Sequence, residues 1–288
     1  DDWTTRHVPP NTVWACVNTL VENNNVSGCY YGVAVTTSNN NIIRNNTIHS
    51  TIRGMSFQAL SNNNLITENT ITESVSSGVH LAYSSSNNTI LGNVINTTRG
   101  VGEGLLQAYV GSNNNLFEDN DVHSEGNKFF MYAAVQSNGN VFKNNRLTGT
   151  ATKAYAAVES AWVETDVPIS HRNYGLAVGT NDNITGGNTS GTVFEGNTIE
   201  GTGAVPAFFI SAITDPYGAW QNIGTVLDGN TVIGTSYSEQ VRVFEMTTAQ
   251  VSSIVSTGNT FGDTAAGKFV LPRGTAHLTT DTGNNWTV

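Results

Sequence analysis

Short runs of alternating hydrophobic and polar residues recur along this chain, and clusters of Asn and Gly separate them. Examples are GMSFQAL at 54–60, LITENTI at 65–71 and GVHLAY at 78–83. A period of two is the pattern of half-buried β-strands, and no stretch of useful length shows the 3.6-residue period of a helix. The Gly and Asn clusters supply turn chemistry. The pattern therefore predicts an all-β protein of brief strands and tight turns.

One phrase of the sequence repeats. Residues 61–71 read SNNNLITENTI, and 38–48, 112–122 and 137–147 read SNNNIIRNNTI, SNNNLFEDNDV and SNGNVFKNNRL. The late Asn of each copy falls at Asn46, Asn69, Asn93, Asn120, Asn145, Asn197, Asn230 and Asn259. The intervals are 23, 24, 27, 25, 52, 33 and 29 residues. A unit of this length with short strands is one coil of a β-solenoid.

Stacked coils explain why so many Asn residues stand beside apolar ones. In a parallel β-helix, successive coils lie about 4.8 Å apart, so each corner residue sits above its counterpart. Asn tolerates the left-handed backbone of a tight corner, and its amide can bond to the next corner. We therefore expect Asn46, Asn69, Asn93 and Asn120 to form a ladder in register.

Residues 12–262, through these repeats, resemble the right-handed parallel β-helix repeat superfamily. Its members include pectate-lyase-like enzymes, phage tailspikes, polysaccharide depolymerases, and periplasmic or surface proteins with NNTI-style repeats. The resemblance implies a single-stranded right-handed parallel β-helix of about nine to ten coils. We expect one domain over 1–288, with a long loop insertion around 161–187 and an irregular stretch at 263–288. Function is not fixed by this fold, because hydrolases, lyases, epimerases and binding proteins share it.

Composition limits the partners. The net charge is −10 with only 12 Lys plus Arg, so no basic stripe exists for nucleic acid. No apolar run approaches 18 residues, which argues against membrane insertion. Charged residues make up only 12%, and the Asn-, Thr-, Ser- and Gly-rich surface is typical of extracellular, virion or cell-surface solenoids. Cys16 and Cys29, half a coil apart, are expected to be buried free thiols. The chain begins at Asp1 without a signal peptide, as a mature form or a fragment would.

The repeat aligns one wall of the coil. Met55, Val79, Leu106 and Met131 align, and two residues later so do Phe57, Leu81, Ala108 and Ala133, which should point inward. The column between them reads Ser56, His80, Gln107 and Tyr132, and the next outward column reads Gln58, Ala82, Tyr109 and Ala134. Tyr155 and Glu159 join this outer face by a looser alignment. Aromatic rings beside hydrogen-bonding groups suit a sugar, and an ordinary solvated β-face is the alternative.

Two loop regions could flank this wall. The insertion holds Trp162, Glu164, His171 and Arg172, in a chain that is otherwise poor in charge. Long insertions on a rigid scaffold are commonly functional, and a structural flap is the alternative. Residues 97–104 and 123–129 supply Glu103 and Glu125, which could lie one coil apart. Two carboxylates about 5 to 10 Å apart are what glycoside hydrolysis uses, and solvent-facing loop acids are the alternative.

These candidates favour a polysaccharide-degrading protein, most simply a glycoside hydrolase. Its catalytic candidates are Glu159, Glu125, Glu103, His80, Tyr132 and His171. Its substrate-binding candidates are Gln107, Tyr109, Tyr155, Trp162, Glu164 and Arg172. A polysaccharide lyase, a non-catalytic adhesin and a structural rod stay open as alternatives. We expect no required cofactor, although Asp182 in 179–187 could hold calcium, and the resemblance to tailspikes implies a homotrimer.

Overall fold

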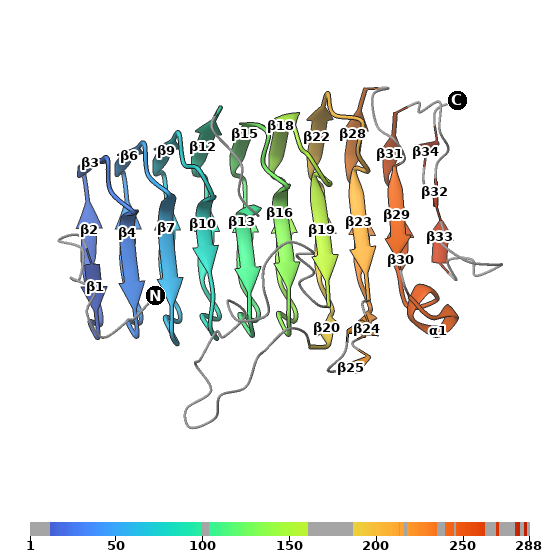
Figure 1. The fold of residues 1–288 in the computed structure, drawn as a ribbon, viewed down its shortest axis with the longest axis horizontal. Coiled ribbons are helices and arrows are strands. Elements are labelled where there is room, and N and C mark those ends of the chain that lie inside the picture. The colour runs from blue at the N-terminus through green and yellow to red at the C-terminus, as the bar shows by residue number, and fades with distance from the viewer. Residues whose placement is uncertain are drawn as a thin grey trace.

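The intervals between Asn-rich phrases define the fold, because each interval is one turn of the chain. The structure is a computed structural model that describes residues 12–98, 104–160, 187–212, 214–215, 218–219, 221–234, 240–244, 246–262, 269–270, 280–282 and 285–286. The chain winds into a right-handed parallel β-helix whose strands follow one another along a rod (Figure 1). The predicted fold class and the resemblance to the β-helix superfamily are confirmed.

Each coil contributes one strand to each of three parallel sheets of ten strands. The first sheet contains β1 (Thr12–Trp14), β4 (Tyr31–Thr36), β7 (Arg53–Gln58), β10 (Ser77–Leu81), β13 (Gly104–Tyr109), β16 (Phe129–Ala134), β19 (Ala156–Glu159), β23 (Phe208–Ser211), β29 (Val241–Phe244) and β32 (Phe269–Val270). The second contains β2 (Leu20–Glu22), β5 (Ile42–Arg44), β8 (Leu65–Thr67), β11 (Thr89–Leu91), β14 (Leu116–Glu118), β17 (Val141–Lys143), β21 (Val193–Glu195), β27 (Val226–Asp228), β30 (Val255–Thr257) and β33 (Thr280–Thr282).

The third sheet contains β3 (Asn25–Ser27), β6 (Thr47–His49), β9 (Thr70–Thr72), β12 (Val94–Thr97), β15 (Asp121–Glu125), β18 (Arg146–Thr150), β22 (Thr198–Gly201), β28 (Thr231–Ile233), β31 (Thr260–Phe261) and β34 (Asn285–Trp286). Two small sheets pair β20 (Thr189–Ser190) with β26 (Asn222–Ile223) and β24 (Thr214–Asp215) with β25 (Gly218–Ala219). The short helix α1 spans Thr248–Val251.

The core runs unbroken along the inside of the rod. Met55, Val79, Leu106 and Met131 lie in register in the first sheet and are buried, as the repeat predicts. Rings stack one above another in the second sheet, where the centroids of Phe117 and Phe142 lie 4.6 Å apart. Because each coil packs only on its neighbours, the core grows with the number of coils.

The expected Asn ladder is present. Asn46, Asn69, Asn93 and Asn120 are buried, and each side-chain oxygen accepts bonds from the backbone and side-chain N–H groups of the Asn one coil before it. The ladder continues through Asn145, Asn197, Asn230 and Asn259. A second ladder runs through Asn41, Asn64, Asn88, Asn115 and Asn140 at the neighbouring corner. Both ladders satisfy backbone groups that a buried turn would otherwise leave without partners.

One part of the ladder hypothesis needs correction. The left-handed residue at each corner is the one before the ladder Asn: Asn45, Glu68, Gly92 and Asp119 have φ between 52° and 65°. The ladder Asn itself is not left-handed. Two different residues adopt the left-handed backbone and form the ladder. A left-handed residue points its side chain outward, whereas the side-chain amide of a ladder Asn must point along the rod.

The long interval in the repeat does not interrupt the sheets. Asn145 and Asn197 are 52 residues apart, yet they are neighbours in the ladder, with Nδ2 and Oδ1 3.0 Å apart. Strands β18 and β22 pair directly. At the other end, the stretch expected to be irregular, 263–288, supplies the last strand of every sheet, β32, β33 and β34. The sequence TGNNW at 282–286 is a further degenerate copy of TGNTF at 257–261, and the pairing of β31 with β34 follows that register.

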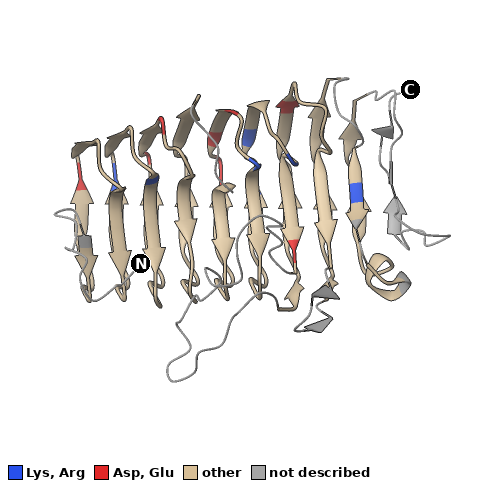
Figure 2. Cartoon of the chain, in the orientation of Figure 1, with Lys and Arg blue, Asp and Glu red and all other residues tan. Residues whose placement is uncertain are grey.

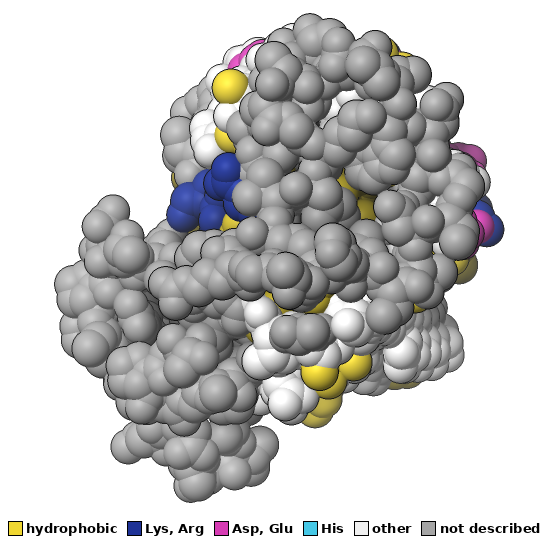
Figure 3. All heavy atoms as spheres, turned by 90° about the vertical axis from the view of Figure 1, so that its right-hand side faces the viewer, with side chains coloured by type: hydrophobic (Ala, Val, Ile, Leu, Met, Phe, Trp, Pro, Cys, Tyr) yellow, Lys and Arg dark blue, Asp and Glu magenta, His cyan; other side chains and the backbone are white. Residues whose placement is uncertain are grey.

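Charge is unevenly distributed on this rod. Figure 2 shows acidic and basic residues mainly on the second and third sheets and the corners that join them, and few on the strands of the first. Figure 3 looks along the rod from its last strands and shows charged side chains on the flanks. The two cysteines are free thiols, as expected, but they are half-buried rather than buried. Within the described residues, no helix is long and apolar enough to cross a bilayer.

Candidate functional site

The outer face of the first sheet carries the columns that the repeat predicts. Ser56, His80, Gln107 and Tyr132 lie in register across β7, β10, β13 and β16. In the next outward column, Tyr109 lies beside Ala134, and Ala134 beside Glu159. The looser alignment of Glu159 is therefore confirmed, and five of the six residues expected on this face point away from the core.

This face is not an ordinary solvated surface. His80, Gln107, Tyr109, Tyr132 and Glu159 are all buried. Tyr109 and Tyr132 belong to a second apolar cluster, separate from the core, to which Phe129 and Phe209 also contribute. The expectation that these side chains lie open to solvent is wrong, because the repeat fixes their direction from the coil but not what lies over them.

Tyr155 is the exception in direction. It lies inside the coil, where its ring packs edge-on against Phe130 at 5.2 Å. Its hydroxyl donates to Gly149 O and accepts from Gly203 N. Two consecutive residues face inward at the start of some strands of this sheet, as Phe130 and Met131 do and as Tyr155 and Ala156 do. Burial raises the pKa of the Tyr155 phenol, and the expected substrate contact by Tyr155 is withdrawn.

A polar cluster centred on Glu159 forms the most reactive group on this face. Its Oε2 accepts a hydrogen bond of 2.7 Å from Tyr132 Oη, and its Oε1 lies 2.7 Å from Lys153 Nζ. The Lys153 ammonium also lies 5.1 Å from the ring centroids of Phe129 and Phe209. The Lys153 side chain is 40% exposed and the Glu159 side chain 2%, so the ion pair marks the boundary between buried and open surface.

The geometry restricts the chemistry that Glu159 can perform. A general acid must give up a proton, but both Glu159 oxygens already accept bonds from Tyr132 and Lys153. A carboxylate held in this way suits a base, a nucleophile or a group that stabilises developing positive charge. Ser211, one coil further along, is buried beside Glu159, and its Oγ has no hydrogen-bond partner. The sequence offered no clue to Ser211, because a serine in a Ser-rich chain is unremarkable until its neighbours are known.

The other half of the face is polar and contains His80. Its Nδ1 lies 3.4 Å from Ser56 Oγ, which accepts a bond from Gln58 Nε2. Ser77 Oγ donates to Gln107 Oε1. Burial, followed by the positive charge of Arg53, holds the pKa of His80 well below the usual 6.5. The ring is therefore neutral at pH 7 and cannot act as a cationic anchor.

The buried His80 makes stability depend on pH. Since the unfolded chain binds a proton near pH 6.5 and the folded chain only at lower pH, acidification below 6.5 favours unfolding. We expect this residue to remove up to about 1.4 kcal/mol of stability per pH unit. Urea unfolding at several pH values between 7 and 5 measures it, with His80→Gln as the non-titrating control. Equal slopes in the two proteins would show that His80 does not cause the dependence.

Arg53 is a functional candidate that the sequence interpretation missed. It begins β7 on the outer face, beside Tyr31 and Ser77 in the adjoining strands. Its buried Nε has no hydrogen-bond partner, and it has no carboxylate partner in the described structure. Four other described bases form ion pairs: Arg44, Lys143, Arg146 and Lys153. No sequence pattern marks Arg53, because only the fold shows which bases lack a carboxylate neighbour among the described residues.

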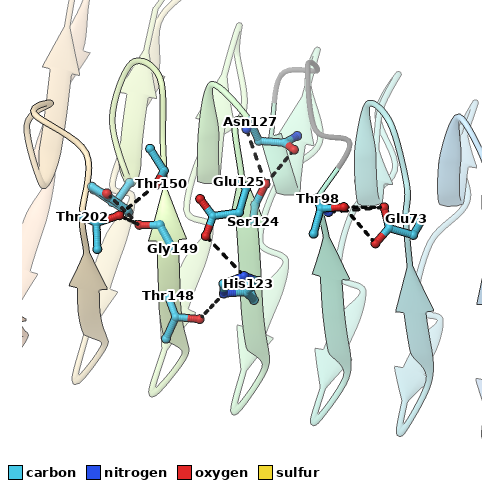
Figure 4. A network of polar contacts seen from close by, with 11 residues as sticks. Glu73, Thr98, His123, Ser124, Glu125, Asn127, Thr148, Gly149, Thr150 and Thr202 are labelled. Atoms are coloured by element: carbon cyan, nitrogen blue, oxygen red, sulfur yellow. Dashed lines mark hydrogen bonds and ion pairs between the residues drawn. The ribbon is translucent and has the colours of Figure 1, made fainter.

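Glu125 does not lie beside Glu159. It ends β15 in the third sheet, where His123 Nε2 lies 3.5 Å from its Oε1 and His123 Nδ1 bonds to Thr148 (Figure 4). Glu159 is level with Ala134, the last residue of β16, whereas Glu125 precedes that strand and belongs to the third sheet. The two acids therefore lie on different sheets and at opposite ends of β16.

The remaining candidates lie outside the described residues. They are Glu103, Trp162, Glu164, His171 and Arg172, together with Asp182, the residue considered for calcium. Among the residues that the structure describes, no three His, Cys, Asp or Glu side chains converge as a metal site would require.

Comparisons with known proteins support the fold. A family model described as periplasmic copper-binding protein (NosD) matches residues 10–149, a little under half of the chain. No curated protein matches the sequence.

Several solved structures are similar to this chain at low identity and with TM-scores below 0.5. The A-module of the Azotobacter vinelandii mannuronan C-5 epimerase AlgE6 is 14% identical, with a TM-score of 0.45, and the match covers 92% of this chain and 80% of that one. The catalytic domain of a GH87 α-1,3-glucanase is 11% identical, with a TM-score of 0.43 and coverage of 96% and 62%. The tailspike of Acinetobacter baumannii phage AM24 is 15% identical, with a TM-score of 0.36 and coverage of 89% and 50%.

Proposed function

We propose that this parallel β-helix protein binds a polysaccharide on the outer face of its first sheet and cleaves it as a glycoside hydrolase. The observation that carries the proposal is the Glu159 carboxylate, held by Tyr132 and Lys153 at 2.7 Å and surrounded by aromatic rings. Aromatic faces pack on the apolar side of a sugar ring, and neighbouring polar groups bond to its hydroxyls. The solvent edge at Lys153 is where a glycan would first meet the cluster.

The residues divide into roles. Glu159 acts as the nucleophile or base, because its two oxygens face donors and it has no proton to give. Tyr132 orients the carboxylate, and Lys153 balances its charge. His80, Gln107 and Tyr109 are buried and stay candidates for contacts to sugar hydroxyls on sequence grounds, and Arg53 offers a cation to an acidic substituent.

The proton donor is not among the described acids of this face. Glu125 lies on the third sheet and Glu159 on the first, so we do not pair them in one hydrolytic step. Glu103, Glu164 and His171 stay candidates for the donor, and Trp162 and Arg172 stay candidates for substrate contacts, on sequence grounds. If Tyr132 served as a base beside an acidic sugar, the reaction would be elimination, and the protein would be a lyase.

The test is the Glu159→Gln variant, which keeps the side-chain shape and removes the charge. We expect at least a 100-fold loss of cleavage, in the range that a base or nucleophile contributes, with glycan binding retained. Release of reducing ends from capsular and plant polysaccharides measures hydrolysis. Glu200→Gln, which alters an exposed acid of the third sheet, is the matched control and should keep full activity.

Each other outcome identifies a different function. Unsaturated products absorbing in the ultraviolet, in place of simple reducing ends, identify a lyase. Retention on an immobilised glycan without cleavage identifies a non-catalytic binding protein or adhesin. Neither binding nor cleavage across the panel refutes the proposal and leaves a structural rod.

Copper binding, which the matched family description names, is not supported by the described residues. Copper sites are built from converging ligands such as Cys and His, and no three His, Cys, Asp or Glu side chains converge in the described part of the chain. Cys16 and Cys29 bond instead to the backbone carbonyls of Trp14 and Ser27. We therefore derive no step through copper.

We further propose that the protein works outside the cytoplasm, since its substrate would be a surface or capsular glycan. The low charge content and the Asn-, Thr-, Ser- and Gly-rich surface support this placement.

A further inference from the structure

The second sheet carries an outward column of side chains that is aliphatic at every level from β2 to β30 except Thr89. The middle residue of each strand there points into the core, so the flanking residues point outward. The first residues of the strands lie in register along the rod. This aliphatic column consists of Leu20, Ile42, Leu65, Thr89, Leu116, Val141, Val193, Val226 and Val255.

The aliphatic column is open to solvent. Leu20 and Ile42 are 48% and 39% exposed, and the other members are partly exposed. With coils about 4.8 Å apart, nine positions extend for about 38 Å. Aliphatic side chains stacked in a column bury part of their surface against one another, but their outer surface remains in contact with water. A largely apolar strip of this length on a rod marks an interaction surface.

A charged column runs beside it, formed by the last residue of each strand. It reads Glu22, Arg44, Thr67, Leu91, Glu118, Lys143, Glu195, Asp228 and Thr257. Glu118 and Lys143 are neighbours near the middle of the rod. If a second rod lies against this face with its coils in the opposite order, the Glu of each rod faces the Lys of the other.

We propose that this face binds a second copy of the chain in antiparallel orientation, related by a twofold axis that crosses the rods between β14 and β17. This axis runs parallel to the strands, so it keeps the strand direction and reverses the order of the coils. The aliphatic column of one rod therefore contacts the aliphatic column of the other, and the charged columns also face each other. Leu116 then packs on Val141 of the partner subunit, and Glu118 faces Lys143 of the partner subunit, each contact occurring twice.

Charge and overlap together set the register. In this alignment the strands β5 to β30 overlap over eight coils, and no like charges face each other. Sliding by one coil in one direction sets Glu118 against Glu118 of the partner subunit. Sliding in the other direction sets Lys143 against Lys143 of the partner subunit. The alignment that pairs Arg44 with Glu118 of the partner subunit also pairs Glu22 with Lys143 of the partner subunit and avoids like charges. It overlaps over only six coils, so the longer apolar overlap favours the first alignment.

The overlap fits a weak dimer. Eight coils extend for about 34 Å, and five residues of strand and corner for about 16 Å, which gives roughly 550 Å² per partner. That area is at the low end for specific interfaces, so we expect micromolar dissociation. A homotrimer with parallel rods would instead bring equal coils together around a common axis, and this face offers no complementary charges for that arrangement.

Analytical ultracentrifugation over a concentration series tests the proposal. We expect a reversible dimer, weakened at least tenfold by Leu116→Asn. The matched control is Val94→Asn, a strand-starting residue that is 44% exposed on the third sheet and should leave the dimer unchanged. Circular dichroism confirms that each variant is folded.

Charge exchange tests the register. Glu118→Lys and Lys143→Glu should each weaken the dimer, and the double exchange should restore it. Under the shorter alignment with Arg44, the double exchange would create like-charge contacts and restore nothing. A monomer at all concentrations, a trimer, or a dimer unaffected by Leu116→Asn each overturns the proposal.

Discussion

Replacing Asn93 by Ala is expected to lower the free energy of unfolding by about 4 kcal/mol. The Asn93 oxygen accepts bonds from the backbone and side-chain N–H groups of Asn69, and its Nδ2 donates to Ile66 O, Leu91 O and Asn120 Oδ1. Alanine removes all five bonds. The buried Asn69 amide then loses its acceptor at a corner that water does not reach, and an unpaired buried group costs about 1 to 3 kcal/mol.

Urea unfolding measures the loss, and Asn96→Ala is the matched control. Asn96 is only three residues away, is exposed on β12, and forms no side-chain hydrogen bond in the described structure, so its replacement should cost less than about 0.5 kcal/mol. Hydrogen exchange at the Asn69 amide adds a local measurement and should accelerate in the Asn93 variant alone. Similar losses in the two variants would show that the ladder contributes little.

The Asn93→Asp variant tests the hydrogen-bond acceptor of the amide separately from its donor. It keeps an acceptor for the Asn69 N–H groups but replaces the donor that serves Ile66 O and Asn120 Oδ1. A second acceptor would then face these oxygens in a buried corner. The cost should therefore be at least as large as for Ala at pH 7, and smaller in mild acid, where the carboxyl regains a proton to donate.

The sequence predicts the fold well because the repeat interval is itself structural. Asn46, Asn69 and Asn93 recur at intervals close to one turn of chain, so aligning them also aligns every strand between them. The register of His80 with Gln107, and of Gln107 with Tyr132, follows from that alignment alone. What the repeat could not show was which corner residue is left-handed, because Asn serves both positions in several copies.

The candidate site is less predictable, because it depends on contacts between residues that no period relates. Lys153 lies in a turn before β19 and reaches along the strand to Glu159, a contact set by the path of one turn. Tyr155 turns inward together with Ala156, and a strict two-residue alternation does not include two consecutive inward residues. The burial of the outer face depends on packing outside the repeat. The repeat therefore predicts which way these side chains point from the coil, but not whether they are exposed to solvent.

Replacing Phe142 by Ala is expected to cost about 4 kcal/mol, the range for removing a large buried ring. Phe142 is fully buried and stacks between two rings, with centroids 4.6 Å from Phe117 and 5.2 Å from Phe194. Phe142→Leu retains most of the volume and should cost roughly 1 to 1.5 kcal/mol. Thermal and urea unfolding of both variants give the comparison, and equal losses would mean that the site collapses around the smaller side chain.

The same variant tests how cooperative the rod is. Each coil contacts only its neighbours, so a cavity between β14 and β21 weakens the interfaces on both sides of β17 and no others. Hydrogen exchange in Phe142→Ala should accelerate first in these three strands and spread outward only as the denaturant concentration rises. Uniform acceleration from β4 to β30 would instead show that the rod unfolds as one unit, in which case every coil shares the cost of a single cavity.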